Sequence, residues 1–279
     1  MKIVVPIDFS PAAEHALRYT DEFTDNLNIE IVLAHALPKR IKDSDKQERY
    51  RKLVRIGEQY ILDDAPWEIV MESGDILDII NDLIQRERVV CTVLGSPPVE
   101  NGVRKFSSSA LRLITSAETP FMIVQEDHRI KSRMEHITIP IDLHSDDMRI
   151  LEAAAALAMP QGSQVHILAS WNSDKSKQNL GREIAEVSVE YFKELGVEAT
   201  VKYAPETKNF DDYLIHYAQE MQSDLIAIPH HGDSALKRMF GKDFAQTVLL
   251  NQYRIPVFTL DPKNNFYFRD IKTLGKRKD

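Results

Sequence analysis

Short apolar runs alternate with longer amphipathic stretches along the whole first half of the chain. The apolar runs predict buried β-strands, and the stretches with an apolar residue every three or four positions predict helices. Ser10 followed by Pro11 is typical of a helix N-cap and first turn. The expected strands are residues 3–7, 29–36, 67–71, 89–94 and 120–124, and the expected helices are 11–27, 43–62, 75–85 and 108–115.

The second half repeats this order of elements. The expected strands are residues 137–141, 165–169, 197–203, 225–228 and 257–260, and the expected helices are 146–158, 182–195, 213–221 and 244–250. Lys2-Ile-Val-Val-Pro-Ile-Asp8 opens the first half and His136-Ile-Thr-Ile-Pro-Ile-Asp142 opens the second. The halves also end alike, with an X-Pro step and an apolar run at 119–124 and 255–260. The sequence therefore contains a tandem repeat of one unit, and the polar segment 126–135 is the expected boundary between the two copies.

Strands separated by helices of this length predict right-handed crossovers and a parallel sheet with helices on both faces. Two such sheets in tandem, each doubly wound and five-stranded, give an α/β fold class. Doubly wound sheets bind ligands beyond the carboxyl ends of their strands, where strand order reverses. Asp8 and the pair Gly95-Ser96 follow such strands. If the first and fourth strands are neighbours, these residues line one crevice.

Composition narrows the class of protein further. With 43% hydrophobic and 28% charged residues the sequence is that of a globular protein, and no apolar run approaches the length of a membrane span. A net charge of −8 argues against nonspecific nucleic-acid binding. The single cysteine, Cys91, lies in an apolar run and is expected to be buried. With no secretory signal visible, the cytoplasm is the expected location.

At this point the sequence resembles the universal stress protein family in its tandem two-domain form. The resemblance rests on the strand ending in Asp8 with Ser10 and a helix after it, repeated at Asp142, and on the loop after the fourth strand. It implies domains at 1–128 and 135–262, the adenine nucleotide alpha hydrolase-like fold, and a basic tail at 263–279. It also implies that ATP or another adenine nucleotide is the cofactor in members that bind one, across the loops after the first and fourth strands.

In such members the second loop reads Gly, two residues, Gly, nine residues, then Gly-Ser or Gly-Thr. The first half matches at Gly95, but Pro98 stands at the second glycine and Ser108-Ser109 at the Gly-Ser position. Proline removes a backbone donor, whereas the two serines still supply hydroxyl and amide donors for a phosphate.

The second half departs from the same motif at other positions. Pro229 stands at the first glycine, Gly232 fits the second, and Lys242-Asp243 replaces Gly-Ser. Asp243 would repel a polyphosphate unless Lys242 or a divalent cation offset its charge. The first half is therefore the better candidate for nucleotide binding. The predicted binding residues across both halves are Asp8, Ser10, Gly95, Ser96, Ser108, Ser109, Asp142 and Gly232.

Several of these side chains have a structural alternative. Asp8 either contacts a nucleotide or caps the following helix, and for Asp142 the cap is favoured. The pair His230-His231 lacks further ligands at metal spacing and is expected to line a loop. His35 and His166 are expected to be satisfied strand histidines.

No catalytic or metal-binding motif is present: there is no Gly-x-Ser-x-Gly elbow and no Walker A sequence. Together with this absence, the resemblance to the universal stress protein family implies a noncatalytic, nucleotide-responsive or ligand-responsive module in stress adaptation. The alternatives are a nucleotide-independent protein-interaction scaffold and a slow ATP hydrolase. The strands that close each half are expected to pair with one another as a pseudo-two-fold internal dimer, and whether two chains form a homodimer stays open. The tail is expected either to be solvated or to contact an acidic partner.

Overall fold

Contacts divide the chain into two compact units, with the boundary in the sequence between residues 132 and 133. Each unit is described by itself. The computed structural model describes residues 1–25, 27–62, 65–97, 108–116, 119–131, 133–141, 148–170, 175–205, 209–229 and 244–260. The tail, Asp142, Gly232 and the pair His230-His231 lie outside these residues.

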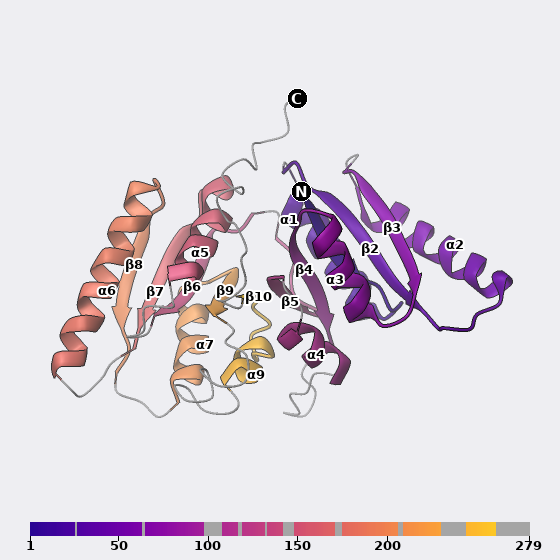
Figure 1. The fold of residues 1–279 in the computed structure, drawn as a ribbon. Helices are drawn as coiled ribbons and strands as arrows, with labels where there is room; N and C mark the ends of the chain where they lie inside the picture. The colour runs from indigo at the N-terminus through magenta and orange to yellow at the C-terminus, as the bar shows by residue number, and fades with distance from the viewer. Residues whose placement is uncertain are drawn as a thin grey trace. The chain divides into compact units, whose positions relative to one another are not determined.

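The first unit is a five-stranded parallel sheet with strand order β3-β2-β1-β4-β5 (Figure 1). Its elements are β1 (Lys2–Pro6), α1 (Pro11–Thr24), β2 (Glu30–Leu37), α2 (Asp43–Tyr60), β3 (Trp67–Ser73), α3 (Ile76–Arg86), β4 (Val89–Ser96), α4 (Ser108–Ser116) and β5 (Phe121–Gln125). Strand order reverses between β1 and β4, so the predicted α/β doubly wound sheet is confirmed and its switch point lies there.

The second unit has the same topology, with strand order β10-β9-β6-β7-β8. Its elements are β6 (His136–Ile141), α5 (Met148–Gln161), β7 (Gln164–Ala169), α6 (Lys175–Glu194), β8 (Ala199–Tyr203), α7 (Phe210–Glu220), β9 (Leu225–Pro229), α9 (Phe244–Leu249) and β10 (Val257–Leu260). The expected duplication of the fold is confirmed. The pairing of the two closing strands stays a prediction.

The core of each unit is the apolar middle of its central strands. Val4 and Val93 in the first unit and Ile139 and Ile226 in the second are fully buried. Such strands are apolar throughout because helices cover both faces of the sheet. In the first unit α1 packs against α2, and α3 packs against α4. Right-handed crossovers on either side of β1 place these two pairs on opposite faces.

Several helices differ by a few residues from the predicted bounds, and two of the differences have a clear local cause. The helix expected from residue 182 begins seven residues earlier, as α6, because its polar first turns carry no apolar period to mark them. Helix α1 ends at Thr24 instead of residue 27, since the backbone turns extended at Asp25. The predicted cap of α1 is confirmed: Ser10 is the N-cap and Pro11 the first helical residue.

Candidate functional site

The loop after β1 carries two of the predicted binding residues, and both support the start of α1. Ser10 Oγ accepts a hydrogen bond from the Ala13 amide at 3.2 Å, and Asp8 Oδ1 accepts one from the Ser10 amide at 2.9 Å. The helix is thus capped by Ser10, and Asp8 braces the cap in a short turn. Asp8 is exposed. Among the described residues no hydrogen bond to its other oxygen, Oδ2, is present, so a carboxylate oxygen stands at the edge of the switch point.

Gly95 lies near the carboxyl end of β4, directly against the first turn of α1. A Cβ atom built at Gly95 would lie 2.0 Å from the Ala12 carbonyl oxygen, closer than any real contact. Glycine is therefore required here by the approach of the α1 backbone, whatever else the residue does. This contact brings Gly95 beside the loop of Asp8 and Ser10, as the sequence predicted for neighbouring first and fourth strands.

Ser96 follows Gly95 and is almost completely buried, with a relative exposure of 1%. Its hydroxyl donates to the Pro97 carbonyl at 3.2 Å, and its own carbonyl accepts from the Glu126 amide at 2.7 Å. The Ser96 side chain is thus held inside the protein. A role for its hydroxyl in ligand binding stays a prediction.

Helix α4 begins at Ser108, where the resemblance placed the Gly-Ser step. The side chains of Ser108 and Ser109 lie outside the description, so their role also stays a prediction. One turn later, Arg112 forms an ion pair with Asp75, the N-cap residue of α3. The hydrogen bond from Arg112 lowers the pKa of the Asp75 carboxyl, with help from the Leu77 amide. This pair links the starts of α3 and α4 on one face of the sheet.

A second cluster at this edge of the first sheet was not predicted as a site. Phe9 has a left-handed backbone, with φ of 66°, which is uncommon for a residue other than glycine. Its ring lies 4.7 Å from the His35 ring, centre to centre, and Lys52 Nζ lies 4.3 Å from the centre of the Phe9 ring. An ammonium over an aromatic ring is a favourable cation–π contact.

His35 is 4% exposed and joins this cluster to the sheet. Its Nε2 lies 3.1 Å from Arg49 Nη1, and its Nδ1 lies 2.6 Å from the Ile7 carbonyl oxygen. A guanidinium can only donate, so Nε2 accepts and Nδ1 carries the proton that it donates to Ile7. Burial lowers the pKa of His35, and the Arg49 charge lowers it further against the raising effect of the Ile7 bond. The imidazole is therefore a neutral acceptor that fixes Arg49.

Only the register of the strands could have revealed this cluster in advance. Pro6 of β1 stands opposite Ala34 of β2, which places His35 level with the end of β1. The expectation that His35 and His166 are satisfied strand histidines is confirmed, because each makes two hydrogen bonds. Cys91 is also buried as expected, and burial raises the pKa of its thiol.

Two classes of site have no candidate within the described ranges. They contain no group of three or more histidine, cysteine, aspartate or glutamate side chains placed to hold a metal ion. No described helix is long and apolar enough to cross a membrane. What the first unit offers is hydrogen-bond acceptors, backbone donors and fixed cations, which suit the binding of a polar ligand.

Comparison with known proteins shows which family and which solved structures this chain is similar to. The model of the universal stress protein family matches residues 1–125 and again residues 134–258. No functionally curated protein matches the chain in sequence. Among solved structures, a universal stress protein from Archaeoglobus fulgidus DSM 4304 is similar over 94% of this chain and 98% of its own, with 17% identity and a TM-score of 0.76.

Two further solved structures are also similar to this chain. A functionally unknown protein from Pseudomonas aeruginosa PAO1 is similar over 98% of this chain and 95% of its own, with 13% identity and a TM-score of 0.61. A universal stress protein in complex with cAMP covers 47% of this chain and 99% of its own, with 15% identity and a TM-score of 0.39. Because the family model matches both halves separately, the chain belongs to the universal stress protein family, with two of its domains in tandem.

Proposed function

We propose that this chain is a noncatalytic module of stress adaptation that responds to an adenine nucleotide bound in its first domain. The binding crevice lies beyond the carboxyl ends of β1 and β4, at the switch point of the sheet. The observation that carries the proposal is the close approach of Gly95 to the first turn of α1, which sets it beside Asp8 and Ser10.

The residues of this edge suggest how a nucleotide would be held. The exposed Asp8 carboxylate suits the hydroxyls of a ribose or the amine of a base, since it can only accept hydrogen bonds. The start of α4 at Ser108 supplies backbone amides and the positive end of a helix for phosphate. Asp142 and Gly232 would have the matching roles in the second domain, where Asp243 opposes phosphate. Occupancy of the first crevice would change the surface that residues 96–107 present to a partner protein.

Calorimetric titration of the full chain with ATP, ADP, AMP and cAMP tests the proposal. We expect one site per chain, lost in Asp8→Asn and retained in the matched second-domain variant Asp142→Asn. Mass spectrometry of the native protein as purified would detect a retained nucleotide directly. If none of the four nucleotides binds at millimolar concentration, the proposal fails.

A protein-interaction scaffold without a nucleotide is the second candidate. Pro98 at the second glycine position and the buried hydroxyl of Ser96 favour it, since both reduce the donors available to a phosphate. An empty crevice after purification, together with flat titrations, would select this function. A hydrolase would instead release phosphate from ATP, and a turnover assay separates it from both binding functions.

Several other properties stay predictions of the sequence. These are the cytoplasmic location, the domain bounds 1–128 and 135–262, the association of two chains, and a contact between the tail at 263–279 and an acidic partner. Removal of residues 263–279 would test the last of these, because it should weaken only the capture of acidic partners. Ligand titrations should be unchanged by the truncation.

A further inference from the structure

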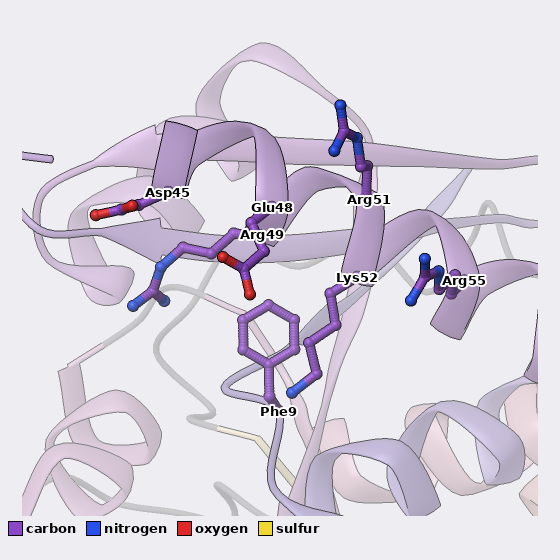
Figure 2. A pocket seen from close by; sticks show the side chains of 7 residues that line it. All are labelled: Phe9, Asp45, Glu48, Arg49, Arg51, Lys52 and Arg55. Atoms are coloured by element: carbon purple, nitrogen blue, oxygen red, sulfur yellow. The ribbon is translucent and has the colours of Figure 1, made fainter. Parts of the chain in front are cut away.

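A cleft of about 710 Å³ lies between the loop after β1 and helix α2 (Figure 2). Phe9 forms its floor, and every other lining side chain comes from α2. These are Asp45, Glu48, Arg49, Arg51, Lys52 and Arg55. The volume is that of a small-molecule site, although the lining is charged where such sites are usually apolar.

The lining carries four cations and two carboxylates, which leaves an excess of positive charge. Arg51, Lys52 and Arg55 are exposed, and none of the four cations forms an ion pair with a carboxylate in the described part of the chain. Elsewhere in the first domain, Lys2, Arg86 and Arg112 all have carboxylate partners. A group of unpaired cations around a hollow, in a chain of net charge −8, marks a place where an anion is favoured.

Part of this lining is held in place before any ligand arrives. His35 is buried beneath the cleft and accepts a hydrogen bond from Arg49, so one guanidinium is already oriented. Lys52 extends down from α2 to the Phe9 ring, as Figure 2 shows. Fixing cations in advance lowers the entropy cost of binding, which separates this lining from a row of freely moving surface side chains.

We propose that this cleft binds a small molecule carrying two or more phosphate groups. Arginine suits phosphate because its guanidinium donates two parallel hydrogen bonds to two oxygens. A multiply charged ligand is favoured because Asp45 and Glu48 offset half of the positive charge of the lining. The site shares the loop after β1 with the proposed nucleotide crevice, but all of its cations come from α2, which packs against β2 and β3.

The described part of the second domain carries different residues at the matching positions. Its counterpart of His35 is the buried Ala169, because Pro6 is opposite Ala34 and Pro140 is opposite Leu168. Its counterpart of α2 is α6, in which Arg182 is accompanied by Glu183 and Glu186 along the matching turns. The histidine that orients Arg49 is therefore a feature of the first domain that the second domain does not repeat.

Calorimetry of the full chain with inorganic tripolyphosphate at low ionic strength tests the site. We expect saturable binding to the wild type and a loss of roughly tenfold in affinity for each cation removed in Lys52→Gln with Arg55→Gln. The matched control is Lys39→Gln with Arg40→Gln, which removes the same charge from exposed residues outside the cleft. It should change affinity by less than about threefold, because Lys39 and Arg40 do not line the cleft. Far-UV circular dichroism checks that each variant is folded.

Three results would overturn the proposal: no saturable binding by the wild type, equal losses in both double variants, or tighter binding of an acidic peptide or single-stranded DNA than of tripolyphosphate. The outcome is independent of the nucleotide proposal, which depends on Asp8. Tripolyphosphate binding without AMP binding would leave the cleft in place and remove the nucleotide crevice. Binding of AMP that is unaffected by the Lys52 and Arg55 changes, without tripolyphosphate binding, would do the reverse.

Discussion

The amino-terminal edges of the two sheets carry different chemistry at the same strand position. In the first domain Lys2 opens β1, and its ammonium lies 2.8 Å from Glu68, 3.2 Å from Glu87 and 3.5 Å from Glu30. In the second domain His136 opens β6 and is hydrogen-bonded at 3.1 Å to His166. One edge is thus stabilised by ion pairs and the other by a pair of imidazoles.

The carboxyl-terminal edges differ as well. His35, with its bonds to Arg49 and the Ile7 carbonyl, stands where the second domain has Ala169. The strand interiors have changed less, since both central strands keep an apolar run that ends in Pro-Ile. After the duplication, the two domains have therefore kept the apolar strand interiors that the sheet buries, while the residues at both edges of the sheet have diverged. Because ligands bind at sheet edges in this fold, the two domains need not share a function.

Among substitutions that test the difference between the two domains, the largest loss of stability is expected at Gly95. The equivalent strand end in the second domain is Pro229, which has a Cβ atom and is buried. Gly95→Ala should lower the free energy of unfolding by about 3 kcal/mol or more, because its Cβ would collide with the Ala12 backbone. Urea denaturation followed by circular dichroism measures the change.

Pro229→Ala is the matched control and should cost much less, because the second domain already accommodates a side chain at that position. If Gly95→Ala is as mild as Pro229→Ala, α1 can shift away from β4. The glycine would then be explained by ligand approach and not by packing.

Gly95 also illustrates how far sequence alone reaches. Apolar runs and caps predicted the strands, the doubly wound topology and the start of α1, because these follow from local preference and burial. The glycine was predicted as part of a phosphate loop, whereas its contact with Ala12 depends on the packing of α1 on β4. The cluster of Phe9 and His35 was missed for a similar reason, because strand register and the placement of α2 bring those residues together.

His35→Ala would make the first domain resemble the second at this position. It should lower the free energy of unfolding by about 2 kcal/mol, because it removes two hydrogen bonds of a buried ring. Thermal and urea denaturation measure this change. The reverse exchange, Ala169→His, is the matched variant and should also destabilise, because an imidazole would have to replace a buried methyl group. A stabilising Ala169→His would show that the two edges are interchangeable.

Lys2→Met should have a smaller effect, about 1 kcal/mol, because the three glutamates are partly exposed and solvent screens the ion pairs. The hydrogen bond to Glu68 raises the pKa of Lys2 in the folded state, although burial opposes it. Its contribution to stability is therefore fully present below the unfolded pKa of about 10.4 and is lost as pH rises further. Urea titrations from neutral to alkaline pH should show the wild type converging on Lys2→Met, whereas Lys2→Arg should keep its advantage. A constant difference at all pH values would mean that packing of the side-chain stem, not charge, stabilises this edge.

The smallest expected effects are losses of stability in acid. They come from different histidines in the two domains. Burial lowers the pKa of His15 and His35 in the first domain and of His166 in the second, where the charge of His136 adds to the effect. A histidine with a lowered pKa binds fewer protons folded than unfolded, so its contribution is present above about pH 6.5 and lost as pH falls below it. Hydrogen exchange with mass spectrometry from pH 7.5 to 5, corrected for intrinsic rates, should show both domains loosening. His166→Gln should flatten this loss in the second domain alone, because a glutamine can still bond to Thr200 but cannot take up a proton. An unchanged acid response in that variant would mean that the paired imidazoles of the second edge stay bonded when protonated.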